Sequence, residues 1–236
     1  MVLIPFITIF YKEVITINDI IGIFNQLLKG LGITVSVLIA SAVLSYIIAF
    51  IAGLCRLSKN VFVRKITGLY VEIFRGTSLI VQLFWLYYAI PTLFEIKLGS
   101  NWWTGVIAIA LNYGAYMSEI VRGSILAVDK GQIEAAMALN MSHFQRMRIV
   151  ILPQALRMML GEFGNYTILM LKGTSLVSLI GMTDILYYGD IIRNSNISQA
   201  PLVYSLVLVF YFILALPLIW FTRKAENLSK RGVTSV

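Results

Sequence analysis

The sequence contains one cysteine and one histidine, and only 13% of its 236 residues are charged. Cys55 alone cannot form an intramolecular disulfide, and a single histidine excludes a metal site built from several histidines. Charged residues make up about 25% of a typical soluble domain. With 59% hydrophobic residues and a mean hydropathy of +0.85, the chain is predicted to be an integral membrane protein. A soluble fold of this size cannot bury so much apolar surface.

Five apolar segments are long enough to cross a membrane, since a helical span needs about 20 apolar residues. Each is predicted to be helical, because backbone polar groups in lipid must be paired internally. The spans are Leu31–Leu57, Ile66–Ile90, Trp103–Val121, Gln154–Ile180 and Leu202–Phe221.

Residues 17–28 differ from these spans, because their apolar residues recur at helical spacing between asparagines and an aspartate. This pattern favours a helix lying at the membrane interface. The alternative is a packed extension of the first span. The predicted fold class is all-α integral membrane, with five transmembrane helices, an N-terminal interfacial helix and a cytoplasmic coupling helix. These elements are predicted to form a single domain over residues 1–236.

Positive charge is distributed unequally between the two sides of this arrangement. One side carries thirteen cations, against four on the other. Because cytoplasmic loops are enriched in Lys and Arg, the first side is predicted to be cytoplasmic, with the N-terminus outside and the C-terminus inside. The thirteen are Arg56, Lys59, Arg64, Lys65, Arg122, Lys130, Arg146, Arg148, Arg157, Arg223, Lys224, Lys230 and Arg231, and the four are Lys12, Lys29, Lys97 and Arg193.

The longest cytoplasmic segment is residues 122–157, and within it residues 129–153 are predicted to form a loop with two short capped helices. Gln132–Leu139 contains good helix formers, and Asn140 tolerates the left-handed conformation that ends a helix. Ser142 and Gln145 have the spacing of a capping box that opens a second helix. Pro153 is predicted to stop that helix and to start the next span. A plain loop is the alternative.

The same segment resembles the E-A-A loop of ABC-importer permeases, in which Glu-Ala-Ala is followed by a glycine and, nine residues later, by Ile-x-Leu-Pro. The matching residues are Glu134, Ala135, Ala136, Leu152 and Pro153, whereas Asn140 replaces the usual glycine and Val150 the usual isoleucine. Asparagine is the best substitute for glycine at a left-handed turn, so the departure preserves the geometry. Segments Phe74–Pro91, Gly114–Ile125 and Gly164–Gly181 are similar to the branch that takes up polar amino acids.

The resemblance implies a permease protomer in the bacterial inner membrane, with no enzymatic activity and no cofactor of its own. Its implied partners are an ATP-binding subunit dimer, a second permease protomer, an extracytoplasmic solute-binding protein and the lipid bilayer, but no nucleic acid. Lys172–Ser175 has Lys before Gly, the wrong order for a phosphate-binding loop. ATP and Mg are therefore expected on the partner ATPase.

An apolar cluster in the E-A-A segment is expected to face the cytosol and to need a partner. We expect it to sit in a groove of the ATPase. The residues predicted to couple the two subunits are Glu134, Ala135, Ala136, Leu139, Asn140, His143 and Phe144. His143 fits an exposed loop residue equally well.

Charged residues inside spans are costly and indicate function by default. Glu72 and Arg75 are three residues apart, as are Glu119 and Arg122, so each pair is predicted to neutralise itself across one helical turn. Structural pairing or an inner gate is favoured for these four over contact with a substrate.

The fourth span is predicted to line a central polar cavity. Its candidate substrate-binding residues are Asn165, Tyr166, Lys172, Gly173, Thr174 and Ser175. In similar permeases for basic amino acids this span contains Gly-Asn-Glu and Leu-Lys-Asp-Thr-Ser. Here Tyr166 replaces the glutamate and Gly173 the aspartate, so two carboxylates that would balance a cationic solute are missing.

These replacements favour a zwitterionic solute without extra charge. Polar amino acids and ectoine-type compatible solutes both fit, and the chain also fits the non-binding half of a heterodimeric permease. A secondary transporter or channel is the alternative of a different class. A membrane enzyme is disfavoured, since no cluster of acids has ligand spacing.

Overall fold

A computed structural model describes residues 17–95 and 99–230, with side chains through residue 227. Lys12, Lys97 and Arg231, which entered the charge count, lie outside the described residues. Within the described ranges the chain is helical and contains no strand. The main helices are α2 (Ile17–Arg56), α3 (Val61–Gly76), α4 (Leu79–Phe84), α5 (Ile90–Phe94), α6 (Asn101–Leu126), α7 (Lys130–Ala138), α8 (His143–Gln145), α9 (Leu152–Gly173), α10 (Ile185–Ser195) and α11 (Ala200–Lys230). Two π-helical turns, η1 (Trp85–Ala89) and η2 (Arg146–Ile151), and two 3₁₀ segments, η3 (Thr174–Ile180) and η4 (Ile197–Gln199), join them.

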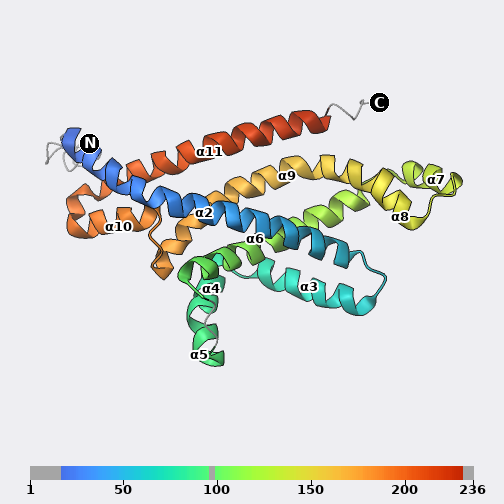
Figure 1. The fold of residues 1–236 in the computed structure, drawn as a ribbon, viewed down its shortest axis with the longest axis horizontal. Coiled ribbons are helices and arrows are strands. Elements are labelled where there is room, and N and C mark those ends of the chain that lie inside the picture. Colours follow the sequence, from blue (N-terminus) through green and yellow to red (C-terminus); the bar gives the residue numbers. More distant parts are fainter. Residues whose placement is uncertain (1–16, 96–98, 231–236) are drawn as a thin grey trace, which may run out of the picture.

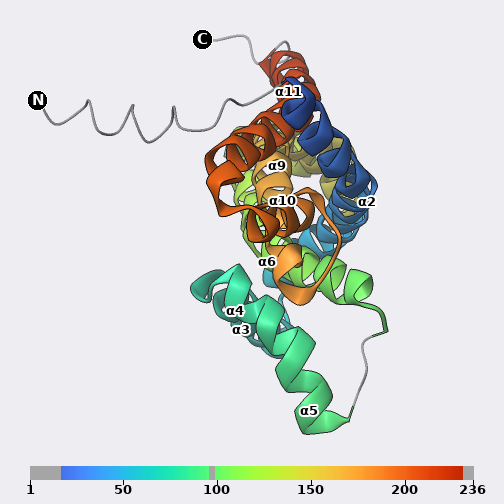
Figure 2. The ribbon, with the colours of Figure 1, turned by 90° about the vertical axis from the view of Figure 1, so that its left-hand side faces the viewer.

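The long helices run lengthwise and α4, η1 and α5 leave them crosswise (Figure 1). In the view along the bundle, α2, α6, α9, α10 and α11 surround a common interior, and α5 projects away from it (Figure 2). The α2–α3 turn, α7 and α8 lie at one end of the molecule, and α10 lies at the other (Figure 1). The end with α7 is the one predicted to be cytoplasmic.

Two helices of the described chain, Ile17–Arg56 and Ile197–Asn227, are long and apolar enough to cross a membrane. Two bent pairs of helices pass the same test when each pair is taken together. The third predicted span, Trp103–Val121, lies inside α6, which has 26 residues but is not among these helices. Membrane-spanning helices are thus present, and the count of five remains a prediction for α6.

The second predicted span, Ile66–Ile90, is not a single helix, so that prediction was wrong. α3 ends at Gly76 and α4 begins at Leu79, with an angle of 108° between the two parts. Two extended residues, Thr77 and Ser78, separate them. Hydropathy averaged over a whole span does not register this break, because most residues of Ile66–Ile90 are apolar.

Side chains satisfy the backbone carbonyls that the break leaves free. The Phe74 carbonyl accepts hydrogen bonds from Gln82 Nε2 at 2.9 Å and from Asn112 Nδ2 at 3.0 Å. Gln82 Nε2 also donates to Thr77 Oγ1 at 2.7 Å, and its own Oε1 accepts from Asn112 at 3.0 Å. Irregular backbone at membrane depth is tolerated only where protein groups satisfy it in this way.

Residues 17–28 form the first turns of α2 rather than a separate interfacial helix, which corrects that prediction in favour of the extension of the first span. α2 has 40 residues, a length of about 60 Å. Ile23 and Leu27 are buried with Ile185 and Phe210, which belong to α10 and α11. One side of this segment therefore packs against protein, whereas Ile17, Ile21 and Phe24 remain exposed on the single chain.

Small residues bring α2 and α6 into close contact along the centre of the bundle. Ser41 Oγ donates to the Val106 carbonyl and Ser45 Oγ to the Ala110 carbonyl, both at 3.4 Å. A side chain at Gly53 would meet the Ser118 carbonyl at 2.8 Å. Membrane helices pack through such small residues because lipid provides little hydrophobic driving force between them.

Candidate functional site

The first candidate site is formed by α7 and the turn that follows it. Asp129 caps the N-terminus of α7 by accepting a hydrogen bond from the Gly131 amide at 2.7 Å. At the other end, the Asn140 amide donates to the Met137 carbonyl at 2.9 Å and the Met141 amide to the Ala136 carbonyl at 3.1 Å. This pair of hydrogen bonds is the Schellman motif.

The left-handed turn and the second helix both follow the sequence prediction. Asn140 has φ of 57°, so the predicted left-handed conformation is confirmed. Ser142 and Gln145 form the predicted capping box, with the Ser142 amide donating to Gln145 Oε1 at 2.8 Å and the Gln145 amide donating to Ser142 Oγ at 3.3 Å. The turn therefore fixes the direction of α8 relative to α7.

Substitution of Asn140 tests this turn. We expect Asn140→Gly to leave the end of α7 intact and Asn140→Val to loosen it, because a β-branched residue in the left-handed region is strained by about 1–2 kcal/mol. Amide hydrogen exchange over residues 136–141 should accelerate about 5- to 30-fold in the valine variant. Equal exchange rates in the two variants would contradict the role given to Asn140.

Most residues predicted to couple the chain to an ATPase are exposed on α7, the turn and α8, which we call the α7–α8 surface. Leu139 is 76% exposed and Phe144 is 70% exposed. Glu134, Ala135, Asn140 and His143 are also exposed. Ala136 is the exception, since it is buried at 3% exposure, so its predicted place on an outward apolar surface was wrong.

The chain continues as helix from α8 through η2 into α9, so the prediction that Pro153 stops a helix was wrong. Pro153 lies at the start of α9, directly after the π-helical turn Arg146–Ile151. A π turn is one of the local adjustments by which helices deviate from the regular hydrogen-bond ladder. As a result, the α7–α8 surface is joined to the fourth span without a flexible loop.

The second candidate site is an exposed face of α9. Five of its exposed residues recur at alternating intervals of four and three, so they lie on one side of the helix. They are Met158, Glu162, Asn165, Leu169 and Lys172. Other positions of α9, among them Ala155, Met159 and Met170, are buried. We call the exposed side the α9 face.

Three tyrosines lie beside the α9 face. The Tyr166 ring is stacked on Tyr116 with centroids 5.9 Å apart, and it meets Tyr113 edge-on at 6.5 Å. The Tyr113 hydroxyl donates to the Leu169 carbonyl at 2.9 Å. The Arg75 guanidinium lies over the Tyr116 ring, 5.4 Å from its centroid. These contacts connect α3, α6 and α9 around one cluster of aromatic rings and one cation.

The sequence predictions did not include Tyr113, Tyr116 or Glu162 in a site. Their spacing in the sequence could have indicated two pairs of neighbours, because Tyr113 and Tyr116 are one helical turn apart, as are Glu162 and Tyr166. Their proximity depends on how α6 packs against α9, which spacing within one helix does not specify.

The six predicted substrate residues do not share one surface. Asn165 and Lys172 are exposed, and Tyr166 is half-buried. Thr174 is fully buried and donates a hydrogen bond to the Leu171 carbonyl at 2.6 Å, so its predicted position in a polar cavity was wrong. Ser175 is half-buried and donates to the Lys172 carbonyl at 2.8 Å.

Gly173 is buried against the tyrosine cluster. A Cβ atom at this position would lie 2.9 Å from the Tyr113 hydroxyl. The absence of a side chain therefore allows Tyr113 to approach α9. This position corresponds to the aspartate of the similar permeases for basic amino acids, so here the tyrosine occupies space that a carboxylate would need.

One of the two predicted intrahelical ion pairs is present. Arg122 contacts Glu119 at 2.8 Å, and Arg56 from α2 contacts the same carboxylate at 3.1 Å. Glu72 and Arg75 are not among the ion pairs of the described residues, so the prediction that they pair was wrong. Arg75 instead lies over Tyr116, whose hydroxyl donates to the Arg75 carbonyl at 3.0 Å. Neither prediction of a gate is tested by these contacts.

Among the described residues, no group of three or more His, Cys, Asp or Glu side chains is placed to hold a metal ion. The two candidate sites are the exposed α7–α8 surface and the aromatic and charged α9 face.

Residues 45–227 match the family described as binding-protein-dependent transport system inner membrane component. A probable amino-acid ABC transporter permease from Sinorhizobium fredii is 44% identical over 204 residues, covering 84% of this chain and 85% of that protein. The glutamine transport system permease of Escherichia coli is 34% identical, covering 86% and 93%. The arginine transport system permease of Bacillus subtilis is 34% identical, covering 79% and 88%.

Solved structures agree with these relatives. A crystal structure of an amino acid ABC transporter with histidines has a TM-score of 0.82 and 30% identity, covering 93% of this chain and all of that one. The MetNI methionine transporter, at 18% identity and a TM-score of 0.69, shares the fold. The chain therefore belongs to the family of inner-membrane permease components of binding-protein-dependent ABC transporters. It is an integral membrane transport component rather than an enzyme.

Proposed function

We propose that this chain forms the translocation path of an ATP-driven importer for polar amino acids or related zwitterionic solutes. The observation on which this rests is the α9 face, where Lys172, Asn165 and Glu162 are exposed beside a cluster of tyrosines. Charged and aromatic groups on an exposed face of a membrane helix are costly to place against lipid. They fit a polar path between this protomer and a second one, identical or related.

Lys172 would take the carboxylate of the solute. Its side chain is exposed on the single chain. A hydrogen bond between its ammonium group and a carboxylate is stronger than one between two neutral groups. Asn165 and the backbone carbonyls near η3 would accept hydrogen bonds from the ammonium group. Tyr116 and Tyr166 add aromatic faces, which attract cations. Because Lys172 repels a second positive charge, such a site favours a zwitterion with no net charge over a cationic solute. An ectoine-type solute would fit the same groups.

Lys172→Met tests this assignment. We expect uptake efficiency to fall about tenfold or more, because a hydrogen bond to a charged group contributes about 1.5–3 kcal/mol. Folding should be unaffected, since the Lys172 side chain is exposed. The measurement is solute uptake by the reconstituted complex with its binding protein. The thermal midpoint of unfolding of each variant is measured as the control for folding. The matched control is Lys29→Met, which removes an exposed lysine from the N-terminal part of α2. Unchanged uptake by Lys172→Met would favour a heterodimer whose other half holds the solute.

The α7–α8 surface would dock into a groove of the ATP-binding subunit, which would bind ATP and Mg. Closure of two such subunits would pull the paired surfaces together and rock the spans between outward and inward access. The continuous helix from His143 to Ile180 supports this coupling, because it links the docked surface directly to the α9 face. Glu119 and its two arginines would hold α2 and α6 together during that motion.

The orientation we propose places the N-terminus outside and the C-terminus in the cytoplasm. It is supported by the excess of cations at the end of the molecule that contains the α2–α3 turn and α7. In a variant with Cys55→Ser, we expect a cysteine at Lys59 to react with an impermeant reagent only from the cytoplasmic side, and one at Ile197, which is 82% exposed, only from outside. Labelling of position 59 from outside would contradict the orientation.

A further inference from the structure

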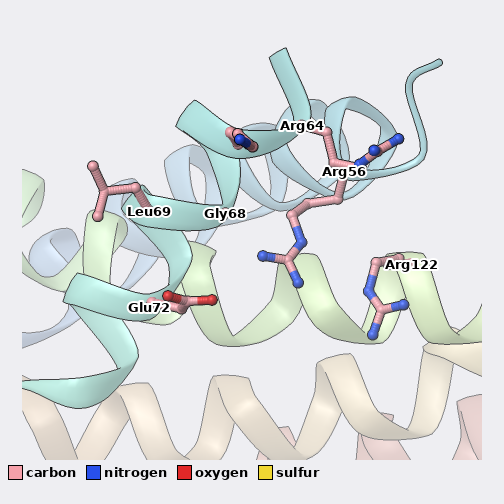
Figure 3. Close-up of a pocket in the computed structure, with 7 residues that line it drawn as sticks. Arg56, Arg64, Gly68, Leu69, Glu72 and Arg122 are labelled. Atoms are coloured by element: carbon pink, nitrogen blue, oxygen red, sulfur yellow. The ribbon is translucent and has the colours of Figure 1, made fainter. Parts of the chain in front are cut away.

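A pocket of about 510 Å³ opens at the end of the molecule that contains the α2–α3 turn, and none of its lining residues belongs to either candidate site. It lies between α2, α3 and α6. Its lining residues are Arg56, Arg64, Lys65, Gly68, Leu69, Glu72 and Arg122. Figure 3 shows the Arg56 and Arg122 guanidinium groups and the Glu72 carboxylate facing the same space.

The pocket has an excess of positive charge. Four cations line it, whereas the available carboxylates are Glu72 in the lining and Glu119, which contacts both Arg56 and Arg122. Two positive charges are therefore left without a matching carboxylate. The Arg56 and Arg122 side chains are partly buried, at 21% and 34% exposure, whereas Arg64 and Lys65 are exposed. Such an arrangement fits a phosphate group better than a neutral ligand.

Gly68 contributes to the shape of the pocket. A Cβ atom there would lie 3.1 Å from Arg56 Nη1. Because Gly68 has no side chain, the Arg56 guanidinium has room beside the backbone of α3 at the pocket.

An apolar stripe on α3 reaches the pocket. Phe62, Ile66, Leu69 and Ile73 are between 50% and 72% exposed and follow one another at intervals of four, three and four. They share one side of the helix, bordered by Lys65, whereas Arg64 lies on the opposite side of the helix. Leu69 belongs both to the stripe and to the pocket lining. A ligand in the pocket would therefore have a phosphate-binding part and an apolar surface in contact with each other.

We propose that this pocket binds the headgroup phosphate of an anionic phospholipid of the cytoplasmic leaflet, with the acyl chains lying along the apolar stripe of α3. A free phosphate shares the headgroup chemistry but makes no use of the stripe. Basic pockets between transmembrane helices at the cytoplasmic side are suited to such headgroups. The lipid would hold the α2–α3 turn at the membrane surface, whichever solute the transporter moves.

The test uses the purified permease–ATPase complex and fluorescent phosphatidylglycerol in detergent micelles. The double variant Arg64→Gln/Lys65→Gln should bind the lipid about 25-fold more weakly, since each cation near an anionic surface contributes about a factor of five. Both residues are exposed, so the variant should fold. Lys59→Gln removes a cation from the same turn outside the pocket lining and should bind like the wild type.

Competition identifies the ligand. Unlabelled phosphatidylglycerol should displace the probe, whereas inorganic phosphate and phosphatidylcholine should not. Displacement by inorganic phosphate at matched concentration would overturn the lipid assignment in favour of a soluble anion. Equal binding by the double variant and the wild type would overturn the site itself. If the double variant loses the ATPase but binds the lipid as the wild type does, the pocket is a protein-docking surface instead.

Discussion

Ala135→Asp is expected to abolish transport and solute-stimulated ATP hydrolysis while leaving the permease folded in the membrane. Ala135 is exposed on α7, so the single chain has room for the new side chain. In the assembled transporter the carboxylate would be enclosed in an apolar groove of the ATPase. An enclosed carboxylate without a partner costs several kcal/mol, which weakens docking more than a hundredfold. Glu134→Lys, which reverses a charge on the same surface, should act in the same direction.

The measurement is coupled ATP hydrolysis and uptake in proteoliposomes, together with the amount of ATPase that purifies with the permease. Asn60→Asp is the matched control, because it adds the same charge in the α2–α3 turn and aspartate caps α3 as well as asparagine does. Wild-type coupling in Ala135→Asp would remove the α7–α8 surface from the docking site. Loss of coupling in both variants would indicate an effect of charge alone.

Gly30→Ala is expected to reduce the yield of folded protein sharply, whereas Gly32→Ala is expected to have no such effect. A Cβ atom at Gly30 would overlap the Asp184 carbonyl and lie 2.5 Å from the Ile185 amide nitrogen. These are backbone atoms at the start of α10, so they cannot rotate away. Overpacking of this kind costs about 1–3 kcal/mol, and the upper end applies where backbone must move.

Gly32 provides a matched control in the same helix, because a Cβ atom there meets nothing within 4 Å. Alanine favours a helix over glycine by about 1 kcal/mol, so Gly32→Ala should be neutral or stabilising. The comparison uses the thermal midpoint and the monodisperse yield of each variant in detergent. Equal values for the two alanine variants would show that α2 and α10 are not packed through Gly30.

The local features of the cytoplasmic segment could be predicted because they depend on neighbours in the sequence. The left-handed Asn140 and the Ser142–Gln145 capping box each involve residues a few positions apart. Pro153 was misjudged because the preceding π turn is not encoded in a simple proline rule. The burial of Ala136 depends on which side of α7 meets the rest of the chain.

Features that depend on contacts between helices were less predictable. Hydropathy placed the apolar segments, but it did not detect the break after Gly76. At this break the Phe74 carbonyl accepts hydrogen bonds from Gln82 and Asn112. It also separated residues 17–28 from α2, although Ile23 and Leu27 pack in the interior. In the same way, the tyrosine cluster beside the α9 face results from how α6 packs against α9.

Uptake by the reconstituted complex, with its ATPase and binding protein and with ATP on the cytoplasmic side, tests the central claim most directly. We predict saturable uptake of a polar amino acid that requires ATP, the ATPase subunits and the binding protein, and that is lost in Ala135→Asp. Uptake that persists without the ATPase, driven by an ion gradient, would contradict the account and indicate a secondary carrier.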